Sequence, residues 1–301
     1  MSMRFLHAAV LFSALLHGSS AFAVPSPAAL QKLHQEEAES YRIYRDEAHT
    51  QPLELRAKPV FNWTNVVGEH PQYGHLYVWT LGGRPEAIGT MFSTQTTDTR
   101  KRKLVHEFHT LSTAKLFPVT PATSAYRWEP QKGIRFDLAE EAPFVAESAG
   151  QRLTQMRGVA RSFAAETRSP PKKNWQLRLL TTPLLQYQPD SGEVLEGAIF
   201  AMVSSAGTDP ELLLVIEARH PAGDEKSWRW HTAAVRFSDV DIIVQRNGKP
   251  LWSSLEDSEL HAEIKNQYTL IETRDKTYMC YQARIIDELP DEGPQATRRE
   301  R

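Results

Sequence analysis

The string at 106–109, His-Glu-Phe-His, concentrates side chains that can bind a metal or move a proton. Its two histidines stand three residues apart, whereas the zinc-peptidase motif needs them four apart on a helix. The neighbouring residues favour a strand, on which Glu107 and His109 share one face and His106 points to the other. The string is therefore consistent with a metal-assisted hydrolase only if Glu107 and His109 gain a third ligand.

The third ligand would come from His75 or Glu86, on strands expected beside this string. The alternative is that these groups are polar side chains of a half-exposed sheet, hydrogen-bonded to their neighbours. We favour the alternative, because three convergent ligands depend on a strand register that the sequence does not specify. No cofactor is therefore expected.

A second candidate site surrounds Gly82 and Gly83, a pair typical of a two-residue hairpin turn. An uninterrupted hairpin places Trp79 opposite Glu86, with Arg84 beside the turn. A tryptophan with an arginine and a carboxylate can hold a sugar or a peptide terminus, by stacking and bidentate hydrogen bonds. The alternative is a cross-strand Trp–Glu pair with a solvated arginine.

The same register puts His75 on the face of Trp79, two pairs farther from the turn. We therefore predict a patch that binds a ligand without performing chemistry. Its candidate residues are His75, Trp79, Arg84, Glu86 and His106.

Two further reactive groups have simpler explanations. Asp209 could be a catalytic carboxylate, but an aspartate before a proline, in a turn between two buried strands, is first a turn residue. Cys280 is the only cysteine and has Tyr278, Met279 and Tyr281 around it, which favours a buried thiol. The chain has no phosphate-binding glycine loop and no nucleophile elbow, so an enzyme is the less favoured class.

The elements that must position these groups are mostly strands. Period-two patterns predict strands near 73–80, 84–93 and 103–111, and again from 175 to the end of the ordered chain. Helical spacing and a Ser148–Gln151 capping box predict a packed amphipathic helix over 148–167. An N-terminal helix is expected to run to about Ala48. The predicted fold class is α+β, with a predominantly antiparallel curled sheet or open barrel.

The N-terminus has the features of a cleaved signal peptide. Arg4 precedes a largely apolar stretch at 5–16, and Ala21 and Ala23 supply the small residues that signal peptidase accepts. We expect cleavage after Ala23, export to the periplasm or beyond, and no later transmembrane segment. The expected organisation is a signal peptide at 1–23, an N-terminal amphipathic helix within 24–52, one β-rich domain at 53–286 and a disordered tail at 287–301.

Composition narrows the classes of partner. Apolar residues make up 41% of the 301 residues, which suffices for a core, and 35 basic residues against 37 acidic ones leave a formal charge of −2. The chain therefore has no basic excess that points to nucleic acid.

Seven segments occur in an order that resembles a family of uncharacterised exported proteins abundant in planctomycete bacteria. The resemblance covers about 59–252 and implies a bacterial envelope or secreted setting, with no activity and no functional residue to carry over. The segments are PVFNWTN at 59–65, VWT at 78–80, GRPEA at 83–87, HEFHTLS at 106–112, LTQMR at 153–157, WQLRLL at 175–180 and GTDPE at 207–211.

These observations favour an exported, non-catalytic binding or structural module. Its expected partner is a polysaccharide or an envelope protein. The metal-assisted hydrolase built on Glu107 and His109 is the alternative.

Overall fold

The structure is a computed structural model. It describes residues 26–65, 71–168, 174–190, 192–205, 207–221, 223, 226–254, 260–265, 268–287 and 289. The expected signal peptide lies outside the described residues, as does the expected tail apart from positions 287 and 289.

The largest sheet has eight strands, all paired antiparallel to their neighbours. In sheet order its path is β18 (Leu260–Lys265), β19 (Tyr268–Thr273), β20 (Tyr278–Asp287), β6 (Lys101–Thr110), β5 (Arg84–Gln95), β4 (Gln72–Leu81) and β2 (Glu54–Leu55), and β3 (Phe61–Asn65) also pairs with β4.

A six-stranded sheet packs against the first one. Its path is β11 (Arg178–Leu179), β13 (Val194–Val203), β14 (Pro210–Arg219), β15 (Arg229–Arg236) and β8 (Asp137–Leu138), with β12 (Leu185–Tyr187) also paired to β13. The other described strands form a four-stranded sheet, β10 (Trp175–Gln176), β9 (Phe163–Arg168), β16 (Asp241–Arg246) and β17 (Lys249–Ser253), and the pair β1 (Arg42–Tyr44) and β7 (Phe117–Val119).

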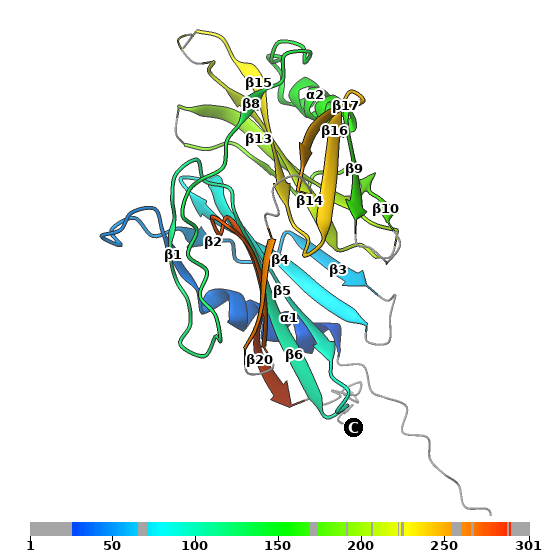
Figure 1. The fold of residues 1–301 in the computed structure, drawn as a ribbon. Helices are drawn as coiled ribbons and strands as arrows, with labels where there is room; N and C mark the ends of the chain where they lie inside the picture. Colours follow the sequence, from blue (N-terminus) through cyan, green and yellow to red (C-terminus); the bar gives the residue numbers. More distant parts are fainter. Residues whose placement is uncertain are drawn as a thin grey trace, which may run out of the picture.

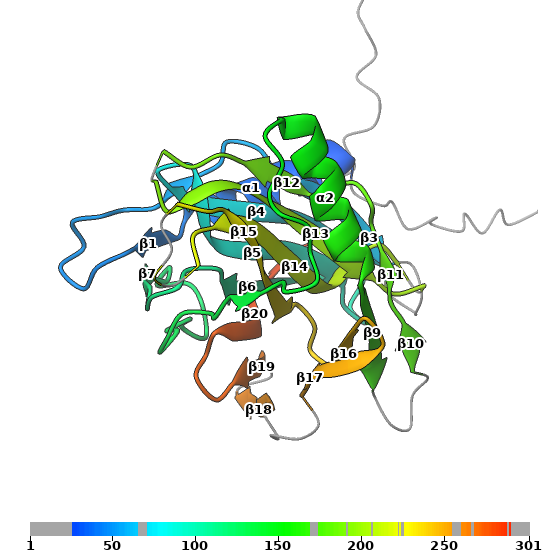
Figure 2. The ribbon, with the colours of Figure 1, turned by 90° about the horizontal axis from the view of Figure 1, so that it is seen from above.

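The two large sheets lie face to face, with a helix on each outer side. Figures 1 and 2 show α1 (Pro27–Glu39) beside β4 and β5, and α2 (Ala149–Arg161) over the six-stranded sheet. The interface between the sheets is apolar, because Leu76, Val78 and Ile88 of one sheet pack with Leu213 and Val215 of the other. The strand-rich α+β class is therefore confirmed. Among the described residues, no helix combines the length and the apolar character that a membrane crossing needs.

Helix α1 is shorter than the sequence indicated. Ser26 caps it by accepting the N–H of Ala29 at 3.1 Å, and the helix ends at Glu39. Beyond it, Tyr41 and Ile43 are buried while Arg42 is exposed, which is the period of a strand. The predicted continuation of the helix to Ala48 is therefore wrong.

Helix α2 begins where it was predicted and ends early. The Ser148 hydroxyl accepts the N–H of Gln151, as the capping box requires. The helix stops at Arg161, and 163–168 continues as β9 with Phe163 and Ala165 buried. Buried positions in a short strand matched the helical spacing of the preceding turns, so the predicted extension to 167 is wrong.

The hairpin of β4 and β5 is confirmed, and its register corrects the prediction. Gly82 and Gly83 have φ of 54° and 79°, which glycine adopts without strain. Leu81 faces Arg84, but an irregularity follows, so Trp79 pairs with Ala87 and not with Glu86. A bulge of this kind separates Trp79 and Glu86 into different environments.

Candidate functional site

Strand β6 divides the 106–109 string between two faces of the large sheet. His106 points toward α1, while Glu107 and His109 belong to the face that meets the other sheets. The sequence analysis predicted this division, because successive side chains of a strand point to opposite faces.

His75 and His106 lie on the same face, where α1 covers both. His75 Nδ1 lies 2.8 Å from Nδ1 of His34, and His106 Nε2 lies 3.1 Å from a carboxylate oxygen of Glu37. Both His34 and Glu37 belong to α1. Burial lowers the pKa of His75 to about 4 and also lowers the pKa of His34 and of His106. These histidines hold α1 on the sheet as neutral side chains and offer no open ligand surface.

Trp79 is 1% exposed and packs in the core of the same face. Its ring centroid lies 5.8 Å from that of Phe108. A ring with no exposed face cannot stack on a ligand, so the prediction of Trp79 as a binding surface is wrong.

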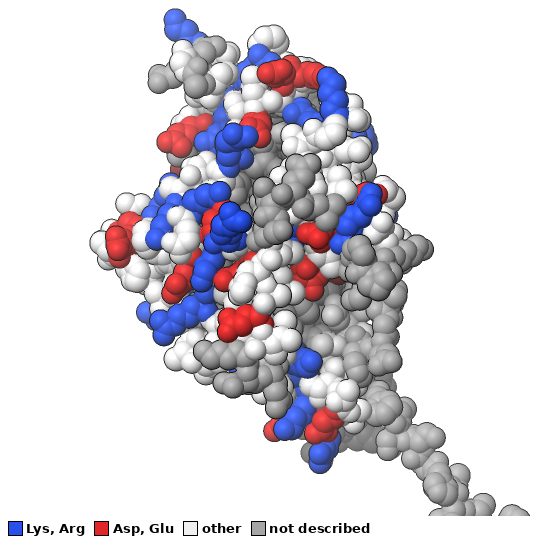
Figure 3. All heavy atoms as spheres, viewed as in Figure 1, with Lys and Arg blue, Asp and Glu red and all other residues white. Residues whose placement is uncertain are grey.

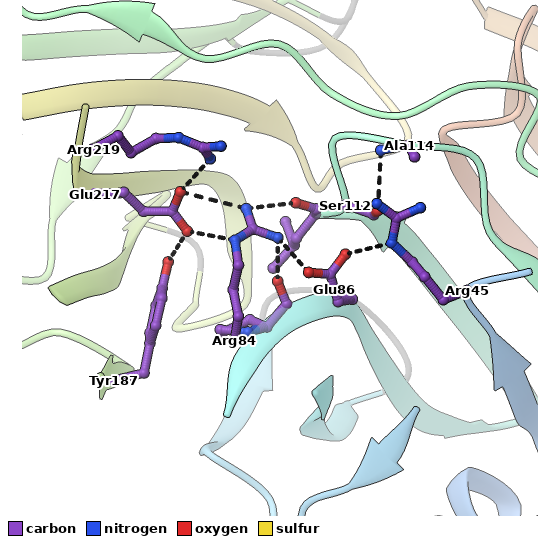
Figure 4. Close-up of polar contacts among 10 residues, drawn as sticks. Arg45, Arg84, Glu86, Ser112, Ala114, Tyr187, Glu217 and Arg219 are labelled. Atoms are coloured by element: carbon purple, nitrogen blue, oxygen red, sulfur yellow. Dashed lines mark hydrogen bonds and ion pairs between the residues drawn. The ribbon is translucent and has the colours of Figure 1, made fainter. Parts of the chain in front are cut away.

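Arg84 and Glu86 belong to a buried charge cluster between the two large sheets. Figure 4 shows the Arg84 guanidinium between Glu86 and Glu217, at 2.7 Å and 3.0 Å. Tyr187 and Arg219 also donate to Glu217, each at 2.7 Å. The two carboxylates raise the pKa of Arg84 further, against the effect of burial. We call these residues, with Arg45 beside Glu86, the Arg84 cluster, and its ion pairs form a clamp between the sheets.

Glu107 opens instead onto a cavity of about 370 Å³ between the sheets, which we call the acidic cavity. Its wall includes the end of β3, where Thr64 and Thr208 exchange hydrogen bonds of 2.9 and 3.1 Å. These bonds tie the eight-stranded sheet to the turn before β14. The carboxyl residues that line the cavity are Glu107, Asp209, Glu211 and Asp239.

Three of these carboxyl groups accept described hydrogen bonds. Tyr278 donates to Glu107 Oε1 at 2.7 Å, Asn65 donates to Asp209 Oδ2 at 3.4 Å, and Ser238 donates to Glu211. Oδ1 of Asp209 is buried and has no hydrogen-bond partner among the described residues. No lysine, arginine or histidine appears among the described residues that line the cavity.

Carboxyl groups without a cation retain their protons. Burial raises the pKa of Glu107 well above its usual value, and Asp239, Glu211 and Asp209 add to the rise. Burial and Asp209 raise the pKa of Glu211 to about 8. The pKa of Asp209 is also raised, mainly by burial. At neutral pH Glu107 and Glu211 therefore present carboxylic acids that donate as well as accept hydrogen bonds.

The rest of the lining is aromatic or neutral and polar. Trp63 is buried and donates to Thr90 at 2.9 Å, which fixes its ring in the wall. Trp175, the other tryptophan of the described lining, is half-buried. Cys280 also lines the cavity, and burial together with Glu107 raises the pKa of its thiol, so it stays protonated and weakly nucleophilic.

His109 does not join Glu107. It lines a different cavity with Arg236 and Asp275, and its Nδ1 lies 2.6 Å from the carbonyl oxygen of Thr110. Among the described residues, no three side chains of metal-binding type come together. The Glu107 and His109 pair of the hydrolase alternative therefore has no common site.

Sequence reasoning did not identify the residues that complete the acidic cavity as a site. Asp209 was interpreted as a turn residue, and Glu211 and Asp239 were not singled out. Asp209 and Glu211 lie at the start of β14, and Asp239 lies three residues after the end of β15. These two strands are neighbours in one sheet. Carboxylates at adjacent strand ends gather at one edge of a sheet.

No family model, no curated protein and no solved structure matches the chain.

Proposed function

We propose that the protein is an exported glycan-binding module and that the acidic cavity is its binding site. The observation that supports the proposal most strongly is the cavity lining. Four carboxyl residues from three segments share about 370 Å³ with two tryptophans and lack a basic neighbour among the described lining residues.

Neutral glycans match this lining in chemistry and size. Sugar hydroxyls both donate and accept hydrogen bonds, as do protonated carboxyl groups such as that of Glu107 in the wall. The half-buried ring of Trp175 supplies an apolar face for a sugar ring. The volume lies within the range of about 300–1,000 Å³ that is common for small-molecule sites.

Charge disfavours other ligand classes. A phosphate or a nucleic acid needs cations that the described lining does not provide. Acidic and basic side chains are interspersed on the face shown in Figure 3, in keeping with a net charge of −2.

Export supports a ligand found outside the cytoplasm. The apolar stretch at 5–16 and the residues Ala21 and Ala23 favour cleavage after Ala23. Intact mass of the protein secreted by its own host tests this part of the proposal, because a species that retains residues 1–23 would contradict it.

Calorimetric titration with neutral oligosaccharides tests the binding site. We expect Trp175→Ala to weaken binding at least tenfold, about 1.4 kcal/mol, because the stacking face is lost. Trp228→Ala is the matched control, since Trp228 is half-buried and stacks on His220 outside the cavity. Equal weakening by both variants, or no binding of any neutral glycan by the wild type, would contradict the proposal.

A further inference from the structure

We propose that α1 is a pH-sensitive switch: protonation of the buried His34–His75 pair releases the first turns of the helix from the sheet, while Glu37 holds the last turn. The switch lies on the face of the eight-stranded sheet opposite to the acidic cavity. It therefore does not depend on the proposed glycan-binding function.

Helix α1 has a thin apolar contact with the sheet. Its buried side chains are those of Leu30, His34, Glu37 and Ala38, which recur at the spacing of one helical face. Two of these four side chains are polar. Because only a leucine and an alanine supply buried apolar contact, the attachment of the helix depends on the contacts that His34 and Glu37 make with the sheet.

The contact between His34 and His75 has room for one proton. The two Nδ1 atoms lie 2.8 Å apart, and the residues are 0% and 7% exposed. At this distance one nitrogen donates its hydrogen and the other accepts it with a lone pair. When both rings are protonated, two N–H groups point at each other, and repulsion between two cations replaces the hydrogen bond.

The surroundings of the pair do not compensate an added charge. His34 Nε2 lies 3.1 Å from the hydroxyl of Ser93, which accepts a hydrogen bond from Arg102 at 3.3 Å. His106 also faces His34, and no described carboxylate forms an ion pair with either ring of the pair. Burial lowers the pKa of His75 to about 4. The neutral pair is therefore complete above pH 6.5 and is lost as the pH falls toward 4.

The other end of α1 responds to acid in the opposite sense. Glu37 forms an ion pair with Arg284 and lies 3.1 Å from Nε2 of His106. Protonation of His106 adds an attraction to the Glu37 carboxylate. Although burial acts to raise it, the contacts with His106 and Arg284 lower the pKa of Glu37, so the carboxylate persists in mild acid. Tyr41 and Tyr281, which contact His106 and each other, stay neutral. Helix α1 therefore opens from its first turns.

Hydrogen exchange at pH 7, 5 and 4, corrected for the intrinsic exchange rates, tests the inference on the full chain. In the wild type, the protection of the amides at 30–34 should fall by about 10–100-fold between pH 7 and pH 4. The amides at 37–39 should lose less. The amides of β13 and β14, which form the core between the sheets, should change by no more than about threefold.

His75→Gln should suppress the release, because the glutamine amide can donate to His34 and carries no charge in acid. Its protection at 30–34 should fall by no more than about threefold between pH 7 and pH 4. His109→Gln is the matched control. His109 is a buried histidine whose pKa is also lowered to about 4, but it lines a cavity on the other face of the sheet. This variant should release α1 as the wild type does.

A wild-type α1 that stays protected at pH 4 would overturn the inference, as would an equal loss of protection in α1 and β14, which marks unfolding of the whole protein. An unchanged release in His75→Gln would also overturn it. The same holds if His109→Gln suppresses the release as strongly. Should His75→Gln fail to fold, His34→Gln gives the second readout: retained protection at pH 4 supports the switch, and the wild-type loss overturns it.

Discussion

The Arg84 cluster and the acidic cavity are both built between sheets from buried carboxyl groups, yet they differ in how the charge is compensated. In the Arg84 cluster, Glu217 contacts Arg84, Arg219 and Tyr187. In the acidic cavity, Glu107 has Tyr278 as its described partner and no basic lining residue. The first arrangement stabilises a fold, whereas the second leaves hydrogen-bonding capacity for a ligand.

The two regions are separated by the apolar interface along β4. Gln72 at the start of this strand lines the acidic cavity, Leu76 and Val78 pack between the sheets, and Arg84 follows the turn at its end. The Arg84 cluster at one end of β4 can therefore fix the distance between the two sheets at the acidic cavity, at the other end of the strand.

Removal of the central cation should have the largest effect on stability. Arg84→Met removes the cation that bridges Glu86 and the fully buried Glu217 and leaves Glu217 with Arg219 and Tyr187, which we expect to lower the free energy of unfolding by about 3–5 kcal/mol. Arg45→Met is the control, because Arg45 is 28% exposed and 3.7 Å from Glu86, and it should cost less than about 1 kcal/mol. Urea unfolding of both variants measures the difference, and equal losses would mean that the cluster is not a clamp.

The carboxyl groups of the acidic cavity should stabilise the fold more at low pH than at high pH, which is the reverse of a paired, ionised carboxylate. Because the folded pKa of Glu211 is raised from 4.5 to about 8, its contribution to stability is complete below pH 4.5 and is lost as the pH rises toward 8. Glu211→Gln should therefore be more stable than the wild type at pH 8, by roughly 4 kcal/mol, and show no such gain at pH 4. A variant that is less stable at both pH values would show that Glu211 is ionised and paired in the fold.

For the histidines beneath α1, the dependence of stability on pH should have the opposite sign. The folded pKa of His75 is lowered from 6.5 to about 4, so the contribution of the neutral ring is complete above pH 6.5 and is lost as the pH falls to 4. His34, His106 and Arg102 face the same region, and Glu37 partly offsets their charge. We expect His75→Gln to flatten this acid limb by about 1–2 kcal/mol in thermal unfolding at pH 4 against pH 7. If His75→Gln loses as much stability between pH 7 and pH 4 as the wild type does, other groups cause that loss.

The smallest effect on stability should come from the binding surface itself. Trp175→Ala removes a half-buried ring from a short strand, and we expect a change within about 1 kcal/mol in urea unfolding. A loss of 3 kcal/mol or more would show that Trp175 is a core residue, like Trp79. Its ring could then not serve as the surface on which a sugar stacks.

Sequence patterns predicted the elements that depend on local chemistry. The Gly82-Gly83 turn, the Ser148 cap and the opposite faces of Glu107 and His106 all follow from conformational preference and side-chain period. The ends of both helices were misplaced, because the strand period of Tyr41 and Ile43 becomes decisive only when the sheet buries them.

The sites depended on contacts that local patterns do not encode. The bulge that separates Trp79 from Glu86 accompanies the contact of Arg84 with Glu217, a residue 133 positions away in the sequence. The acidic cavity likewise requires the packing of two sheets, since Glu107 of one sheet and Asp209 beside the other both line it. The residue types were visible in the sequence, but their convergence was not.

The central claim is that a neutral glycan occupies the acidic cavity, and the indole N–H signals of the protein test it directly. In a ¹H–¹⁵N titration with the oligosaccharide that binds, the signals of Trp63 and Trp175 should shift, because both rings line the cavity. The signals of Trp128 and Trp230 should stay in place, because both are fully buried in other core clusters. Binding that leaves the Trp63 and Trp175 signals unmoved would contradict the account.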